Sequence, residues 1–486
     1  MPTSIFISRF YLRLKQCYGL DIRALSLMRI AIALVLLIDL AIRATSLTAH
    51  YTKTGVVPFN PIELSFWKSG YFSLFQFNDS YGFALMLFIA TALIYLFLLA
   101  GCKTKLVSFL AWFMLTSLQN RNTLILQGGD DLLRLILFWG MFLPWGNFYS
   151  VDATKPKKKT TLSVATLAYI LLLFSVYFFT GLLKDSPEWN SEGTALHYAL
   201  SLDQMTWPLG KMLLPHSTLL KYLTVFIRWF EMLIPFLLFI PFKNAYFRLI
   251  FILCITTLHL AICSTLYVGL FYLIGITTLI GLLPSSIMNR FDKLIHRKEV
   301  HTKHIHHNKS FLAKLSTNYY FNVILNSFLS FCLALCMIWN ISTINGSGLA
   351  VSDRFNGFGY ALRFNQSWGM FAPTVFKDDG WYIFLGITKD SLKIDLNRNG
   401  AKIDYAKPTN ILALIKDDRW RKYQENYLFT YNAFIRPYYC NYLLSNWNKI
   451  HPDKEITSLK IIYMKEVSVL PNQKQTIKPD TLCVCK

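Results

Sequence analysis

The stretch ATLAYILLLFSVYFFTGLL, residues 165–183, contains no charged side chain and is nearly as long as a helix that crosses a bilayer. About 20 predominantly apolar residues span the hydrocarbon core as an α-helix. Comparable runs are IAIALVLLIDLAI at 30–42 and GFALMLFIATALIYLFLLAG at 82–101. The 486 residues are 54% hydrophobic and only 16% charged, whereas soluble domains carry about a quarter charged residues. These features predict an all-α polytopic membrane bundle.

We expect about nine transmembrane helices, because nine segments are apolar enough to span. They cover residues 24–43, 82–101, 104–119, 130–146, 162–182, 219–241, 245–263, 265–284 and 320–341. With the N-terminus inside, the inner segments carry 19 Lys and Arg and the outer segments carry 5. Cytoplasmic loops are enriched in these residues. We therefore expect a cytoplasmic N-terminus and an extracytoplasmic C-terminus, in a bacterial inner membrane or a plasma membrane.

The net charge of +22 raises the question of nucleic-acid binding. A nucleic-acid surface would gather its Lys and Arg on one folded domain. Here they lie in the loops between spans, as in KPKKK from residue 155. The charge therefore favours the lipid bilayer as a partner and argues against nucleic acid.

Hydropathy and charge divide the chain into five parts. These are a cytoplasmic N-terminus (1–23), a transmembrane domain (24–290), a basic His-rich cytoplasmic loop (291–319), a last transmembrane helix (320–345) and an extracytoplasmic domain (346–486). In the last part, DGWYIFLGIT, SLKIDLN and SLKIIYMKEVSV are typical of strands. RWRKYQENYLFTYNAF and YYCNYLLSNWNK are typical of helices. We expect this domain to be α+β or β-rich.

Two groups could bind metal or form disulfides. The histidines between 296 and 307 lie in the basic loop, where a solvated linker is favoured over a metal site, so no metal is expected. CVC at 483–485 ends the chain, and a solvated tail is favoured there. The alternative is that Cys483 and Cys485 form a redox or disulfide element, if that end is extracytoplasmic.

Ionisable residues inside spans usually face the bundle interior and mark function. Asp39 and Arg43 are four residues apart in the first span and can pair on one helix face, as can Asp130 and Arg134 in the fourth. For both pairs a structural role in helix packing is favoured. Arg29, also in the first span, has no such partner four residues away.

The sixth and seventh spans carry further polar groups. Arg228, Glu231 and Pro235 are spaced so that an ion pair and a kink-prone proline share one helix face. Arg228 and Glu231 are therefore expected to pair within the bundle. His259 lies in the apolar stretch CITTLHLAICSTL and has no obvious partner nearby in the sequence, so functional and structural roles are about equally favoured.

Lys184 follows an apolar stretch in VYFFTGLLKDSPEW, residues 176–189, with no acidic residue one turn before it. Removal from water disfavours the charged form of a lysine, and a lysine in such a place can act as a general base. Alternatively, Lys184 extends to the headgroup level or pairs with Asp185 or Glu188. Spacing alone favours this second interpretation.

The same stretch resembles vitamin-K-dependent gamma-glutamyl carboxylases. In that family an aromatic-rich helix end is followed by a Gly, a catalytic Lys and a Trp, and the matching residues here are Gly181, Lys184 and Trp189. The subsequent Gly193 comes one residue later than in the family. LHLAICSTLYVGLF is similar to the histidine-containing helix of the family and includes His259. QSWGMFAP and DGW resemble the region after the last span in bacterial members. The resemblance covers about residues 20–290, the horizontally transferred transmembrane (HTTM) domain.

The resemblance implies an enzyme that carboxylates glutamate in a secreted or extracytoplasmic peptide. Its cofactor would be a lipid quinone, as reduced vitamin K or menaquinol, with dioxygen and carbon dioxide as co-substrates. Lys184 would deprotonate the reduced quinone, whose basic oxidation product removes a proton from the glutamate γ-carbon, and the carbanion captures carbon dioxide. His259 would orient the reactants, and Trp189, Glu231, Arg228 and Arg29 are candidates for binding substrate.

One departure separates this chain from the animal carboxylases. Where those enzymes have a functional histidine, NRNTLILQGGDD offers Asn122 and Thr123. The competing interpretation is a non-enzymatic membrane factor for maturation, export or immunity of a secreted peptide. In that case Lys184 would be replaceable by arginine.

Overall fold

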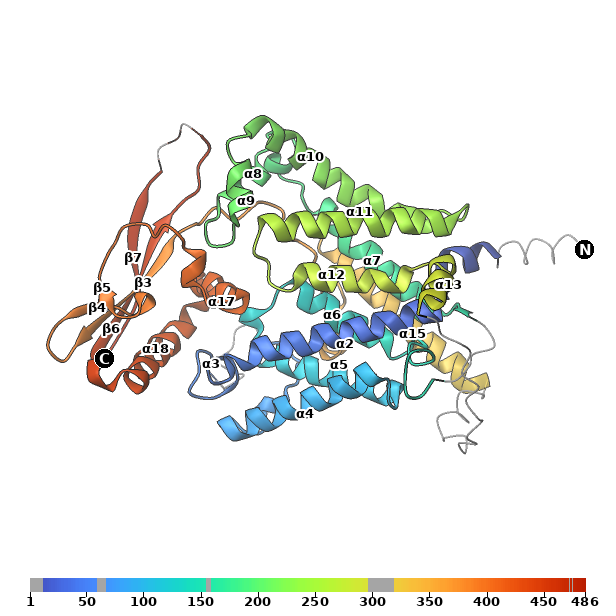
Figure 1. Ribbon diagram of the computed structural model, residues 1–486, viewed down its shortest axis with the longest axis horizontal. Coiled ribbons are helices and arrows are strands. Elements are labelled where there is room, and N and C mark those ends of the chain that lie inside the picture. Colours follow the sequence, from blue (N-terminus) through green and yellow to red (C-terminus); the bar gives the residue numbers. More distant parts are fainter. Residues whose placement is uncertain (1–11, 59–66, 154–158, 296–318, 472, 474) are drawn as a thin grey trace, which may run out of the picture.

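The computed structural model describes residues 12–58, 67–153, 159–295, 319–471, 473 and 475–486. Long helices run along the longest axis, with a β-sheet at one end and the start of α2 (Ile22–Ala44) near the other (Figure 1). The helices of the bundle are α2 (Ile22–Ala44), α4 (Tyr81–Ala100), α5 (Thr104–Arg121), α6 (Gly128–Gly140), α7 (Val164–Leu182), α10 (Ser217–Leu233), α11 (Asn244–Thr265), α12 (Phe271–Leu279), α13 (Ser285–Leu294) and α15 (Tyr319–Ser342). Shorter helices are α3 (Leu47–Tyr51), α8 (Ala195–Ser201) and α9 (Pro208–Leu213).

Within the described ranges, six helices are long and apolar enough to cross a membrane: α2, α4, α7, α10 with its extension to Phe239, α11 and α15. The pair α12–α13, bent by 98°, is a further candidate. The protein is therefore a helical membrane protein, and the coarse fold class is confirmed. The expected number of nine spans is not confirmed, because α5 ends in the polar residues Gln119, Asn120 and Arg121, and α6 has only 13 residues. Helix α5 packs against α4 and α6, and α6 packs against α5 and α7.

The ends of α7 follow from its sequence. Ser163 and Thr166 form a capping box, in which each side-chain oxygen accepts a hydrogen bond from the backbone N–H of the other residue. From there the apolar run continues without interruption to Leu182. The segment KDSP follows the end of the helix. Pro187 disfavours the helical conformation at the residue before it, Ser186. Lys184 consequently lies just beyond the last turn.

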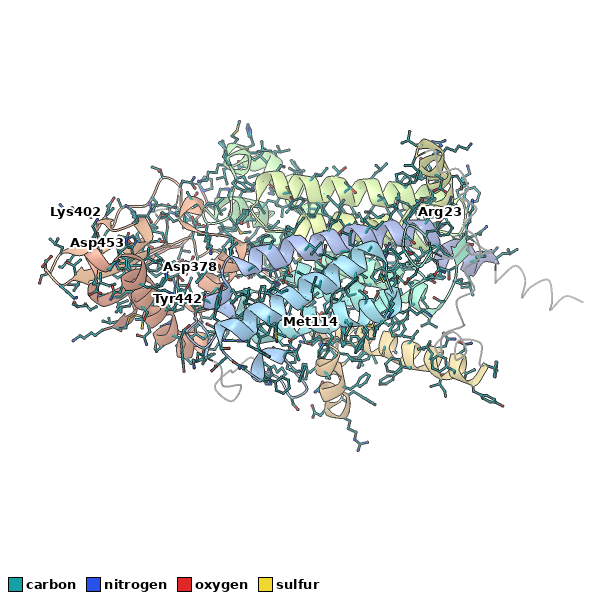
Figure 2. The ribbon with its side chains drawn as sticks, turned by 60° about the horizontal axis from the view of Figure 1, so that its bottom comes forward. Arg23, Met114, Asp378, Lys402, Tyr442 and Asp453 are labelled. Atoms are coloured by element: carbon teal, nitrogen blue, oxygen red, sulfur yellow. A yellow bond between two sulfur atoms is a disulfide. The ribbon has the colours of Figure 1, made fainter. Side chains whose placement is uncertain are left out.

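The bundle end away from the sheet gathers several basic residues and loops. Arg23 lies there, far from Asp378 and Tyr442 of the C-terminal domain (Figure 2). Its guanidinium contacts Asp292 at 2.7 Å, and Asp292 accepts a hydrogen bond from Tyr149 Oη at 2.5 Å. The N-terminal end of α2, the helix α13 and the loop after α6 therefore meet at this end of the bundle.

The C-terminal domain is α+β, as its sequence predicts. Five antiparallel strands lie in the order β5 (Ala401–Lys402), β4 (Lys393–Asp395), β3 (Trp381–Thr388), β6 (Ile456–Glu466) and β7 (Ile477–Cys485). Its helices are α17 (Asp418–Leu428) and α18 (Arg436–Ile450). The preceding helix α16 (Asp353–Ala361) packs against α15 of the bundle, where Tyr360 contacts Trp339. The expected strands correspond to β3, β4 and β6, and the expected helices to α17 and α18.

Strand β3 is buried on both faces, which explains its continuous apolar sequence. Tyr382 and Phe384 pack in a cluster that includes Tyr439 of α18. Trp381 and Ile383, which alternate with them, belong to a second cluster on the other face of the sheet. Side chains of successive strand residues point to opposite faces. The sheet is thus the central layer of this domain.

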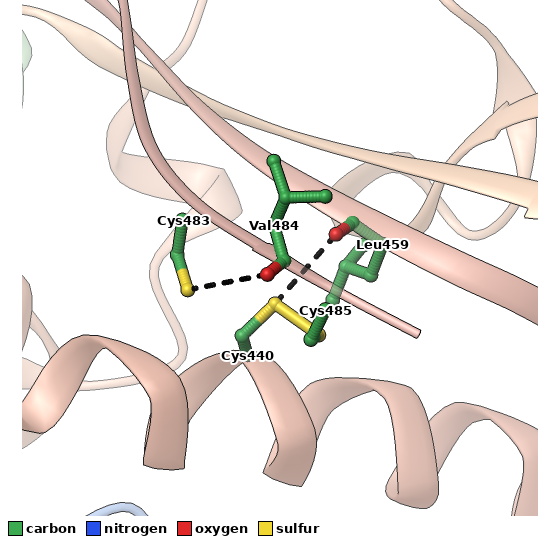
Figure 3. The surroundings of a disulfide bond; sticks show 5 residues. All are labelled: Cys440, Leu459, Cys483, Val484 and Cys485. Atoms are coloured by element: carbon green, nitrogen blue, oxygen red, sulfur yellow. Dashed lines mark hydrogen bonds between the residues drawn. A yellow bond between two sulfur atoms is a disulfide. The ribbon is translucent and has the colours of Figure 1, made fainter.

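The end of the chain is part of the fold. CVC lies in β7, and Cys485 forms a disulfide with Cys440 of α18 (Figure 3). Cys440 is fully buried, and Cys483 is a free thiol. The favoured prediction of a solvated tail is therefore wrong, because β7 pairs with β6 along its length. The sequence offered no way to identify Cys440 as the partner.

Candidate functional site

The candidate site begins at Gly181, where α7 and α10 approach closely. A methyl group added at Gly181 would lie 2.7 Å from both the carbonyl oxygen of Arg228 and the backbone nitrogen of Met232. No side chain fits at that distance, so glycine lets the two helix backbones pack together. The close approach places the loop after α7 directly beside the side chain of Glu231.

Lys184 is 3% exposed, and its ammonium forms a buried ion pair with Glu231. The Nζ atom also lies 4.7 Å from the ring centroid of Trp189, within the range of a cation–π contact. The favoured interpretation of Lys184, at the headgroup level or paired with Asp185 or Glu188, is therefore wrong. The lysine does not reach out to water, and its partner comes from α10. Glu188 instead pairs with Lys377 at 2.5 Å.

The expected ion pair between Arg228 and Glu231 is also wrong. Arg228 donates a hydrogen bond to the side-chain oxygen of Asn190, while Glu231 turns toward Lys184. Residues three apart share a helix face, but a close charge on another segment can be the better partner. In addition, α10 ends at Leu233, before Pro235, and continues as a 3-10 helix rather than as a kinked α-helix.

His259 of α11 lies near this pair and is 2% exposed. Its Nε2 atom is 3.0 Å from Tyr177 Oη of α7, which is the partner that its own sequence neighbourhood lacked. Its Nδ1 atom is buried and has no hydrogen-bond partner among the described residues. A methyl group at Gly275 of α12 would overlap the imidazole ring, so glycine there makes room for it.

These side chains line one cavity of about 470 Å³. Lys184, Trp189, Glu231 and His259 all contribute to its wall, so four of the six predicted site residues come together. Most of the remaining wall is apolar and includes Phe271. Such a cavity has the size and the mixed lining of a small-molecule site.

The C-terminal region supplies part of the wall, which the sequence did not predict. Met370 and Phe371, from the segment QSWGMFAP, line the cavity together with Arg421 and Glu425 of α17. The indole N–H of Trp189 donates to the carbonyl oxygen of Phe371 at 2.8 Å. The resemblance had singled out QSWGMFAP. For α17 the sequence carries no comparable signal.

The structure does not bring Arg29 into this site. Its side chain is fully buried in α2 and donates to backbone carbonyls, among them Trp145 at 3.1 Å and Tyr149 at 2.6 Å. It is not among the residues of the cavity wall. Arg29 therefore ties together helix and loop ends away from the cavity. Arg228 is also absent from the wall, although its neighbours Ile227 and Glu231 belong to it.

A second buried charge cluster joins the bundle to the C-terminal domain. Asp39 and Arg43 pair at 2.7 Å, as predicted. Asp130, however, binds Arg43 at 2.6 Å and Arg419 of α17 at 2.5 Å. The predicted Asp130–Arg134 pair is wrong, because Arg134 contacts the neighbouring acid of the GGDD motif instead. Two acids and two arginines thus form one buried network.

Within the parts of the chain that the structure describes, no group of three or more His, Cys, Asp or Glu side chains is arranged to hold a metal ion. The histidines between 296 and 307 lie outside the described residues. The chain matches no protein-family model, and neither a curated protein nor a solved structure matches it. Its function must therefore be argued from the geometry of the site.

Proposed function

We propose that the cavity is the active site of a membrane enzyme in which Lys184 acts as a general base. The observation that carries the proposal is the buried Lys184–Glu231 pair, which opens on a largely apolar cavity beside His259. Buried ionisable groups that converge on a concave, mostly apolar site are characteristic of catalytic centres. A purely structural ion pair would have no need of an adjoining cavity.

The pair supports base catalysis because it can redistribute one proton without changing its net charge. Transfer of a proton from the Lys184 ammonium to the Glu231 carboxylate leaves a neutral amine beside a neutral acid. The amine can then accept a proton from a substrate, and Trp189 covers one side of it.

A reduced lipid quinone, as reduced vitamin K or menaquinol, fits this cavity as the second reactant. The apolar wall, including Phe271, Met370 and Phe371, suits an aromatic ring. The unpartnered Nδ1 of His259 is available for a hydrogen bond to a ring hydroxyl. When bound, a reduced quinone supplies, with dioxygen, the oxidation that drives carboxylation of a glutamate γ-carbon by carbon dioxide. The wall contains no residue that contradicts such a ligand.

The orientation in the membrane forms part of the proposal. Nine helices would cross, with α5 and α6 as protein-surrounded spans that need not be as apolar as helices in contact with lipid. The basic segments near Arg23 would face the cytoplasm. The Cys440–Cys485 disulfide supports an oxidising compartment for the C-terminal domain. A glutamate-containing peptide would then reach the cavity from the extracytoplasmic face.

The test is incorporation of labelled carbon dioxide into a glutamate-containing peptide by purified protein supplied with reduced quinone and dioxygen. Lys184→Arg keeps the positive charge but cannot provide a neutral amine. We expect it to insert and fold normally and to lose activity. Lys211→Arg is the matched control, because Lys211 is 42% exposed at its side chain and pairs with Asp203 outside the cavity.

Full activity in Lys184→Arg would refute the role of Lys184 as the base. If the unsubstituted protein incorporates no carbon dioxide with several quinones and peptides, the proposed carboxylase activity itself is refuted. The cavity would then belong to a non-enzymatic membrane factor for the maturation or export of a secreted peptide, or for immunity to it. In that case binding of the peptide should persist in Lys184→Arg.

A further inference from the structure

A second cavity, of about 480 Å³, lies where the C-terminal ends of α2 and α11 meet the N-terminal ends of α12 and α17. It adjoins the first cavity, with which it shares Gln127, Leu266 and Val268. Its residues include neither Lys184 nor His259. The second cavity is therefore separate from the proposed catalytic site, and its lining calls for a different kind of ligand.

The charge of this lining is opposite to that of the chain as a whole. Asp39, Asp417 and Asp418 line it, against a single cationic side chain, Arg419, in a protein of net charge +22. Asp39 and Arg419 satisfy each other at 2.6 Å within the buried network. Asp417 caps α17 by accepting a hydrogen bond from the backbone N–H of Trp420 at 3.0 Å. Asp418 is left with an unmet hydrogen-bonding need.

Asp418 is 5% exposed, and only one of its carboxylate oxygens is used. Oδ1 accepts hydrogen bonds from Arg421, whose Nη2 lies 2.8 Å away. Oδ2 is buried without a partner among the described residues. A methyl group on Gly269 would lie 2.6 Å from Oδ2, and Gly269 has a φ of +56°, so a larger residue there would press against this oxygen. A buried carboxylate oxygen without a donor is costly unless a ligand supplies one.

Aromatic rings line the same cavity as Asp418. Tyr267 accepts a hydrogen bond at its Oη from the backbone N–H of Asp418, at 3.1 Å. Trp207 packs edge-on against Tyr267 with ring centroids 5.5 Å apart, and Tyr272 also lines the cavity. Aromatic faces next to a carboxylate are the arrangement that recognises organic cations, through cation–π attraction and a charge-assisted hydrogen bond.

We propose that the second cavity binds an organic cation, with an ammonium group placed against Asp418 Oδ2 and the rings of Trp207 and Tyr267. Two sources supply this chemistry at a membrane surface. One is the headgroup of phosphatidylethanolamine, and the other is a lysine side chain of a bound peptide. The proposal does not depend on carboxylase activity, because it concerns binding alone.

The first experiment compares charged and neutral ligands on the purified, unsubstituted protein. N-acetyl-lysine amide and N-acetyl-norleucine amide differ only in the ammonium group, and their binding is measured by calorimetry. In parallel, protein in nanodiscs of phosphatidylglycerol mixed with phosphatidylethanolamine is examined by native mass spectrometry for the lipid it retains. We expect clear preference for the ammonium-bearing ligand in at least one arm.

The second experiment repeats both arms with Asp418→Asn, which keeps an oxygen acceptor for Arg421 but removes the negative charge. We expect affinity for the preferred ligand to fall about tenfold, since a hydrogen bond to a charged group contributes about 1.5 kcal/mol or more. Asp390→Asn, on an exposed turn of the C-terminal domain, removes the same charge elsewhere and should change nothing. Trp207→Leu should also weaken binding.

Preference for the lysine amide alone assigns the cavity to a peptide side chain, and preference for phosphatidylethanolamine alone assigns it to a lipid headgroup. Preference in both arms supports a site for either source. Equal binding of charged and neutral ligands in both arms overturns the proposal, as does unchanged affinity in a folded Asp418→Asn variant. If that variant does not fold, the comparison on the unsubstituted protein and the Trp207→Leu variant still decide the matter.

Discussion

Arg419→Leu should separate the C-terminal domain from the bundle. Arg419 of α17 contacts Asp130 at 2.5 Å and Asp39 at 2.6 Å, and it donates to the carbonyl oxygen of Ile125 at 2.9 Å. Its side chain is only 7% exposed, and those of the two acids are 1% and 3% exposed. Arg43 is the other cation of the network. Removing Arg419 therefore leaves two buried carboxylates facing a single guanidinium.

The expected loss follows from that uncompensated charge. Breaking a buried ion pair by removing one partner costs about 3–5 kcal/mol of unfolding free energy. The double substitution Arg419→Leu with Asp130→Asn restores neutrality and leaves the Asp39–Arg43 pair, which is 2.7 Å long. We expect it to recover about 1–3 kcal/mol relative to Arg419→Leu, in the range of measured coupling energies between contacting residues.

The assay is a reversible denaturant titration of purified protein in detergent micelles, followed by tryptophan fluorescence. Arg354→Leu, at an exposed position of α16, is the matched control and should cost little. Limited proteolysis should release the C-terminal domain from Arg419→Leu before any other part. A loss no larger than that of Arg354→Leu, or a double variant less stable than Arg419→Leu, would refute the network as the element that joins the two parts.

Three further predictions address topology, pH and the disulfide. Alkaline phosphatase fused after Lys486 should be active and after Lys159 inactive, and the reverse pattern would invert the proposed orientation. Burial raises the pKa of the Asp379 carboxyl from 3.8 to about 7. Because the folded state then binds more protons than the unfolded state, the unfolding free energy should fall as the pH rises from about 4 to about 7. Asp379→Asn should flatten this slope in melting experiments at several pH values. Cys485→Ser should lower the stability of the C-terminal domain by about 2–4 kcal/mol, and an unchanged denaturation midpoint would show that the Cys440–Cys485 bond contributes nothing.

Helices that carry a long uninterrupted apolar run could be predicted closely from the sequence. The expected spans 162–182 and 320–341 correspond to α7, Val164–Leu182, and α15, Tyr319–Ser342. The short helix α6 was harder, because a helix surrounded by protein can carry Asp and Arg that a lipid-facing helix cannot. Hydropathy indicates which helices can contact lipid, so it does not identify a helix whose neighbours are other helices.

Four of the six predicted residues line the cavity, but the pairing between them was not predicted. Lys184 and His259 were singled out from the sequence, and they line the same cavity. Helical spacing assigned Glu231 to Arg228, since periodicity shows which residues share a face but not which neighbouring segment that face meets. The partner of Lys184 is 47 residues away and depends on the close approach of helices at Gly181. Such a contact is set by tertiary packing alone.

Because Met370, Phe371 and α17 form part of the cavity wall, the cavity is completed late in biosynthesis. The bundle emerges from the ribosome first, with Lys184 and Glu231 already made, while more than a hundred residues remain to be translated. Chains fold domain by domain during synthesis, N-terminal parts first. A nascent chain would therefore hold Lys184 in an open, unfinished cleft until the C-terminal domain docks. The order of translation itself would delay completion of this cavity wall.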